Sequence, residues 1–98
     1  MARGRVMKVK YDHRDLGFAN AYLEGDWSYA AGWRLRVEAP ADVDAFRDHL
    51  ARGRCMTLSL LAGDGDWLSG EACVAFVSES TDALSVVTLS GAGPLRRV

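Results

Sequence analysis

The C-terminal third of the chain decides the fold, through residues 68–77 (LSGEACVAFV) and residues 86–95 (VVTLSGAGPL). Both runs are apolar and rich in residues that pack well on a pleated surface, which is typical of β-strands. The second run ends in Gly-Ala-Gly-Pro, where Pro94 cannot donate a hydrogen bond to a strand ladder. The sequence therefore predicts two strands over 67–78 and 84–90, closed by a Gly-x-Gly sequence.

Both of these strands are apolar on both faces. A period of two places Cys73, Ala75 and Val77 on one face of the first strand, and Ala72, Val74 and Phe76 on the other. In the second strand one face holds Val87 and Leu89, and the other Leu84 and Val86. A chain of 98 residues with one helix can cover only part of such a sheet, so we expect another subunit to cover the rest. The residues expected at this interface are Val74, Phe76, Val86, Val87 and Leu89.

Upstream, alternating apolar and polar residues predict four more strands. They cover residues 7–11, 18–23, 33–38 and 56–60. We expect residues 12–17 to form a turn or loop. The Asp-Gly pair within residues 62–66 (AGDGD) is a strong hairpin signal between two of the strands.

One amphipathic helix is predicted over residues 41–52. Val43, Phe46 and Leu50 stand at i, i+3 and i+7, which places them in a single apolar stripe. Gly53 follows as a C-terminal cap, because glycine adopts the left-handed conformation that ends many helices. A helix this short needs a sheet to pack on.

The element order is therefore about β-β-β-α-β-β-β. Hairpins join most of the strands, which indicates an α+β, mainly β fold: an antiparallel sandwich or small barrel with one flanking helix. We expect a single domain over residues 1–98, with residues 1–5 flexible.

Composition excludes several classes of protein. The chain is 49% hydrophobic and 26% charged, with a net charge of −1, so it carries no overall basic field for nucleic acid. It contains no apolar run near the ~18 residues that a membrane span needs. The segment from Val6 to Tyr11 is too short and too charged for the apolar core of a signal peptide. We expect a protein that works in the cytoplasm or in an assembled particle, with no membrane contact.

No residue pattern predicts catalysis, a metal site or a cofactor. Cys55 and Cys73 fit neither a zinc pattern nor a disulfide framework, and we expect Cys73 to pack in the core. His13 has carboxylates beside it in a loop but no third ligand at useful spacing, and His49 lies at the edge of the helix stripe. The sequence favours a protein that is not an enzyme.

Aromatic and basic residues offer a different surface. Trp27, Tyr29 and Trp67 lie outside the clear core pattern, and the chain begins with a cluster of cations. These are Arg3, Arg5, Lys8 and Lys10. Exposed aromatic rings beside cations can stack nucleobases, and they can equally anchor a protein interface.

The second half of the chain resembles a known family. Residues 46–53, 56–61, 68–74 and 87–95 run as a short helix, a strand, a glycine-containing strand and a final strand that closes in Gly-x-Gly. In this order they resemble phage tail-tube proteins and the related tube proteins of contractile injection systems. The resemblance implies a β-barrel or sandwich with one flanking helix, in subunits joined into rings, usually hexameric, and stacked as a tube. It also implies no catalysis and no cofactor.

Two functional hypotheses follow. The first is a non-enzymatic, self-assembling structural protein like a tail-tube ring subunit, with other phage or injection-system components as partners. The second is a small barrel resembling the oligonucleotide-binding fold, which binds single-stranded nucleic acid through the aromatic and basic residues. A module that binds an unidentified protein partner is a third, less specific reading.

Overall fold

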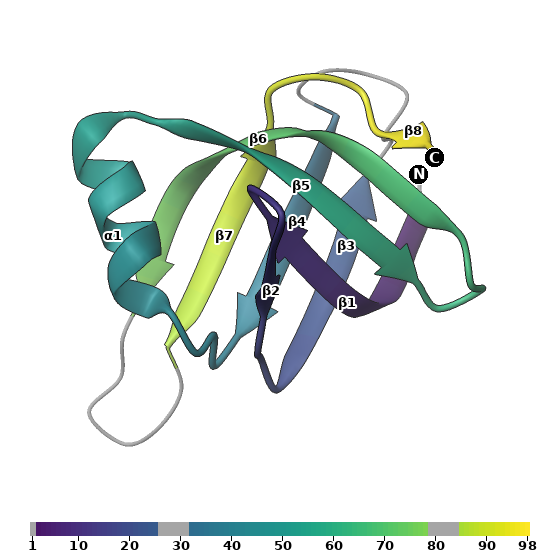
Figure 1. Ribbon diagram of the computed structural model, residues 1–98, viewed down its shortest axis with the longest axis horizontal. Coiled ribbons are helices and arrows are strands. Elements are labelled where there is room, and N and C mark those ends of the chain that lie inside the picture. The colour runs from purple at the N-terminus through teal and green to yellow at the C-terminus, as the bar shows by residue number, and fades with distance from the viewer. Residues whose placement is uncertain (1, 26–31, 79–84) are drawn as a thin grey trace.

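The computed structural model describes residues 2–25, 32–78 and 85–98. Its elements, labelled in Figure 1, are β1 (Ala2–Tyr11), β2 (Arg14–Leu16), β3 (Asn20–Gly25), β4 (Trp33–Glu38), α1 (Val43–Arg52), β5 (Cys55–Ala62), β6 (Trp67–Ser78), β7 (Val86–Gly91) and β8 (Arg96–Arg97).

The long strands close into an antiparallel β-barrel. They follow the order β1-β3-β4-β7-β6-β5, and β5 pairs in turn with β1 (Figure 1). Strand β1 belongs to both sides of the closure: Ala2 to Arg5 pair with β3, whereas Val6 to Tyr11 pair with β5. The register shifts between Val6 and Lys8, which is where β1 passes from one partner to the other.

The expectation of a mainly β, antiparallel small barrel with one helix is confirmed, but the order of elements differs from the predicted one. Strand β2 lies in the segment expected to be a loop. It forms because Asp12 and His13 both have positive φ, 48° and 68°, as the tightest hairpin turns require. Strand β8 is also additional and pairs with β6 beyond Pro94. Residues 2–5, expected to be flexible, are paired in β1.

Helix α1 closes one end of the barrel. It begins at Val43, two residues later than expected, and Phe46 is only 1% exposed. The ring of Phe46 lies 5.4 Å from that of Tyr11, measured between centroids. Gly53 caps the helix as predicted, with φ 64° and its N–H directed to the carbonyls of His49 and Leu50.

The C-terminal segment closes the other end. The indole Nε1 of Trp33 donates a hydrogen bond to the carbonyl of Gly93 at 2.7 Å, and Leu95 is buried. Leu95 lies over Gly70 of β6, where an added Cβ would approach Leu95 Cδ2 at 2.9 Å and the Pro94 carbonyl oxygen at 3.1 Å. Gly70 therefore makes room for the residues that follow the Gly-x-Gly sequence, and Gly93 of that sequence accepts the Trp33 hydrogen bond.

A β-bulge changes the faces of β6. Val74 pairs with Leu89 but Phe76 pairs with Thr88, so Ala75 is the extra residue. Beyond the bulge Val77 returns to the barrel side and packs against the core, while Phe76 points outward. The predicted faces of β6, drawn from a strict period of two, are therefore wrong after Ala75.

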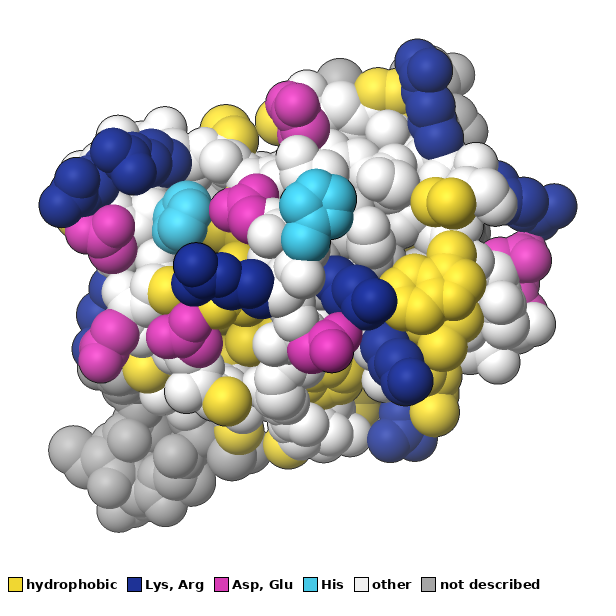
Figure 2. Space-filling model, viewed as in Figure 1, with side chains coloured by type: hydrophobic (Ala, Val, Ile, Leu, Met, Phe, Trp, Pro, Cys, Tyr) yellow, Lys and Arg dark blue, Asp and Glu magenta, His cyan; other side chains and the backbone are white. Residues whose placement is uncertain are grey.

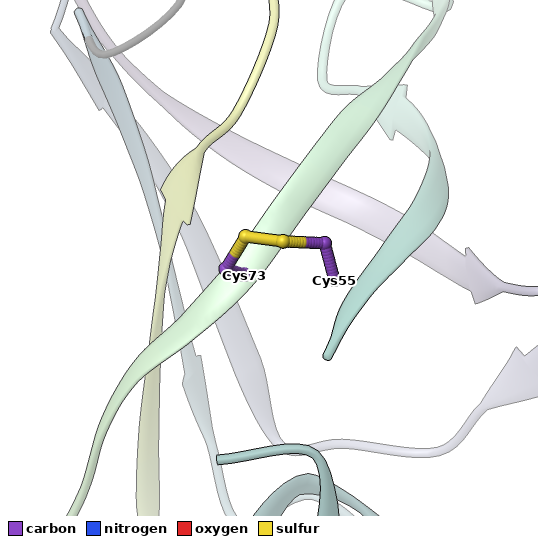
Figure 3. Close-up of a disulfide and its surroundings, with 2 residues drawn as sticks. All are labelled: Cys55 and Cys73. Carbon is purple, nitrogen blue, oxygen red and sulfur yellow. A yellow bond between two sulfur atoms is a disulfide. The ribbon is translucent and has the colours of Figure 1, made fainter. Parts of the chain in front are cut away.

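The two cysteines form a disulfide rather than packing separately. Cys55 and Cys73 lie directly opposite each other on β5 and β6, with Cα atoms 4.1 Å apart (Figure 3). Both lie on the outer side of the barrel, because their neighbours Met56, Ala72 and Val74 fill the inner side. The expectation of a core Cys73 outside any disulfide is wrong, since the pairing depends on a strand register that the sequence does not display.

Candidate functional site

The five residues expected at a subunit interface fall on two different sides of the barrel wall. Val74, Val87 and Leu89 are buried in the barrel core. They could contact a second subunit only if the barrel opened, so their expected interface role is corrected to core packing. Phe76 is 58% exposed and Val86 is half-buried on the outer side. The candidate interface is thus reduced to these two positions.

More apolar surface lies where α1 meets β6. Leu50, the last residue of the helix stripe, is 40% exposed, whereas Phe46 one turn earlier is buried. A groove of about 310 Å³ lies here, lined by Arg47, Leu50, Ala51 and Val77. We call Leu50, Ala51 and Val77, together with Phe76, which precedes Val77 on the outer side of β6, the helix-end surface.

A second candidate site lies on the outer side of β1, β5 and β6. Strand register places Lys8 opposite Leu61, and Leu61 opposite Trp67. In the next row Lys10 is opposite Ser59, and the Lys10 ammonium lies over the Trp67 ring, 5.6 Å from its centroid. Figure 2 shows hydrophobic side chains bordered by lysine and arginine side chains at the right of this face. The barrel closure brings these residues together, because β1 and β6 are both neighbours of β5.

The remaining residues proposed for an aromatic and basic surface are Trp27, Tyr29, Arg3 and Arg5. Trp27 and Tyr29 lie outside the described residues. Arg3 pairs with Glu24 of β3 in the strand register. Arg5 directs its guanidinium to the side-chain oxygen of Asn20 on β3, at 3.4 Å.

The C-terminus adds a cation that the alternation pattern does not indicate. Arg96 of β8 pairs with Ser69 of β6, whose side chain is on the same outer side as Trp67. Arg97 instead forms an ion pair with Asp66 at 2.9 Å. The sequence shows two cations at the end of the chain, but only the β8 pairing assigns Arg96 to this surface.

Among the described residues, Tyr11 beside the helix has a raised pKa. Tyr11 donates its hydroxyl hydrogen bond to the Asp42 carboxylate, just before α1. This bond and, after it, burial raise the pKa of the Tyr11 phenol above its usual value. The Asp42 carboxylate therefore ties β1 to the helix and makes no side-chain cap bond.

We find no candidate metal-binding site within residues 2–25, 32–78 and 85–98. No group of three potential ligands from His, Cys, Asp or Glu occurs there. His13 is exposed in the β1–β2 turn, and His49 places Nδ1 2.7 Å from the Ala45 carbonyl oxygen within its own helix. In the same described segments, no helix is long and apolar enough to cross a bilayer.

Comparison with known proteins identifies the fold but not a family. No protein-family model and no curated protein matches the sequence. The structure is similar to that of a hypothetical protein from Staphylococcus aureus, with a TM-score of 0.78 and 9% sequence identity. The similarity covers 98% of this chain and 71% of that chain. At this identity the likeness shows that the two proteins share a fold.

Proposed function

We propose that the protein is a non-enzymatic structural subunit that self-associates, resembling a ring subunit of a phage tail tube or a contractile injection system. The observation that carries the proposal is the exposure of Phe76 on the outer side of β6. Large aromatic side chains commonly anchor protein interfaces, because they bury much apolar area for little loss of conformational entropy. Phe76 also lies two residues after the segment 68–74, which resembles the tube family.

The barrel limits how such subunits can join. Strands β3, β4 and β7 are paired on both sides over most of their length, whereas β6 from Val74 to Ser78 is paired with β7 alone and has α1 beside it. The strands outside that closed circuit in the described segments, β2 and β8, have three and two residues. Strand addition at these edges would supply few hydrogen bonds. We therefore propose contact through side chains, centred on the helix-end surface.

The most direct variant is Phe76→Ser, because an exposed side chain can be removed without opening the core. Met7 provides a matched control: it is apolar, 54% exposed, and lies at the register shift of β1. We expect Phe76→Ser to lower the oligomer mass measured by light scattering after size exclusion, and Met7→Ser to leave it unchanged. Equal masses for wild type and Phe76→Ser, with both folded by circular dichroism, would contradict the proposal.

The proposal extends to location and partners. The subunit would act in the cytoplasm or in an assembled particle, with other phage or injection-system components as neighbours. A particle that leaves the cell agrees better with the Cys55–Cys73 disulfide, because cytosolic thiols are kept reduced. Mass spectrometry of blocked thiols from freshly lysed cells and from purified particles would distinguish the two locations.

A further inference from the structure

We propose that the outer surface formed by Lys8, Lys10, Trp67 and Arg96 binds single-stranded nucleic acid. We call these residues the basic-aromatic surface. The inference rests on side chains of β1, β6 and β8 and is independent of self-association through Phe76. Its residues lie far apart in the chain and meet only through strand pairing.

The arrangement is an aromatic ring with cations on both sides. Lys8 and Lys10 of β1 lie on one side of Trp67, beyond β5. Arg96 of β8 lies on the other side of β6. Strands in a sheet are about 4.8 Å apart, so Lys10 and Arg96 stand about 14 Å apart across three strand spacings. An anionic backbone crossing this distance would pass beside the indole ring of Trp67, which lies in the neighbouring row.

Trp67 is placed to act as a stacking platform. It is half-buried, which restricts the movement of its ring, and Lys10 lies over it at 5.6 Å. Ser59 and Ser69 lie between the cations in the row of Lys10 and Arg96, and hydroxyls contact phosphate and sugar oxygens in many complexes. Base stacking on an aromatic ring beside cations is the usual way to bind single strands without sequence preference.

The local charge favours an anionic ligand. Arg97 is paired with Asp66 at 2.9 Å, and Lys10 makes a looser contact with Asp15 at 3.9 Å. Lys8 and Arg96 are exposed and carry no ion pair among the described residues. An acidic peptide would satisfy these charges but would make no specific use of the ring, so single-stranded nucleic acid fits the surface better.

The test is a fluorescence-anisotropy titration of the full chain into labelled oligothymidylate at low salt. With three cations engaged, the logarithm of the association constant should fall against the logarithm of salt concentration with a slope of about −2. We expect Trp67→Ala to weaken binding by about fivefold or more, and Trp67→Phe to recover most of that loss. The triple variant K8Q/K10Q/R96Q should remove nearly all salt-dependent binding.

Arg34 and Arg36 supply the matched control. Both are exposed on β4, which is separated from β5 by two strands on one side of the barrel and by β3 and β1 on the other. R34Q/R36Q should bind the oligonucleotide as the wild type does. Absence of binding at low salt, or an equal loss in R34Q/R36Q, would overturn the proposal. So would competition by polyglutamate that matches competition by unlabelled oligothymidylate.

Discussion

The two ends of the barrel are closed by different means. At one end helix α1 inserts Phe46 beside Tyr11, and the apolar residues Leu50 and Phe76 remain exposed around it. At the other end the C-terminal segment crosses β6, burying Leu95 over Gly70 and accepting the Trp33 indole hydrogen bond. The first closure leaves apolar side chains exposed, whereas the second buries its apolar residue within the chain.

Strands that are apolar on both faces led us to predict a larger interface than the exposed residues provide. The three residues on one predicted face of β6 differ in their surroundings. Cys73 bonds to Cys55, Ala75 occupies a bulge, and Val77 turns back to the core. Phe76 is the large apolar side chain of this run that remains exposed, beside the exposed Ala75. An apolar strand can therefore reflect an irregular register as well as a second buried face.

The largest expected effect is at the helix end. Phe46→Ala should lower the free energy of unfolding by about 4 kcal/mol, because it removes a buried ring and leaves a cavity against Tyr11. Leu50→Ala changes the same helix stripe at an exposed position and should cost less than about 1 kcal/mol. Chemical denaturation of both variants measures the contrast. Similar losses would mean that the helix contacts are described wrongly.

The disulfide should give the next largest effect. It links residues 18 positions apart, for which the loss of loop-closure entropy in the unfolded chain corresponds to about 3 kcal/mol. We expect the free energy of unfolding of the double variant C55S/C73S to be lower by this amount. The variant should therefore unfold at a lower denaturant concentration. Adding reductant to the wild type should reproduce the shift, and no shift under complete reduction would contradict it.

At the other end of the barrel, Gly70→Val should cost about 2 kcal/mol. The new side chain would enter the space taken by Leu95 and the Pro94 carbonyl. Gly4→Val is the control, because no atom lies within 4 Å of a Cβ built at Gly4 in β1. Thermal unfolding of the pair checks the closure. A larger loss in Gly4→Val would mean that Gly70 does not make room for the C-terminal segment.

The smallest expected effect is pH-dependent and concerns Tyr11. Its hydrogen bond to Asp42 raises the pKa of the phenol, so the folded state keeps this proton at pH values where the unfolded chain loses it. The contact should contribute about 1 kcal/mol below the usual tyrosine pKa of about 10, and this is lost as pH rises through the folded pKa.

Tyr11→Phe isolates this contribution from those of the other tyrosines. The stability gap between wild type and Tyr11→Phe should be constant near neutral pH and shrink above about pH 10. Denaturation curves across that range give the gap directly. A gap that widens with rising pH would have the wrong sign for a phenol that donates to a carboxylate.

Much of the fold could be predicted because its signals are local. Strand β4 alternates over Trp33–Glu38, and β6 has the predicted bounds Trp67–Ser78. Gly53 caps a helix whose Phe46 is buried as its stripe requires. The bulge at Ala75 could not be predicted, because it depends on packing against β7 rather than on the residues of β6 alone.

The candidate sites were less predictable, because strand pairing assembles them. Lys8, Lys10 and Trp67 are recognisable in the sequence as a basic and aromatic set, but their proximity requires the β1–β5 closure. Arg96 joins them only through β8, a two-residue strand beyond a proline. Phe76 could be predicted as an interface residue from the sequence. The outward direction of its side chain depends on the bulge at Ala75 and could not be predicted.

The solution mass of the wild-type protein tests the central claim most directly. Size exclusion with light scattering over increasing concentration, with electron microscopy of any large species, would measure it. Self-association through the helix-end surface predicts a defined oligomer, seen as rings or tubes, that dissociates in Phe76→Ser. A folded monomer at every concentration would contradict the proposed structural role and leave the basic-aromatic surface as the remaining functional site.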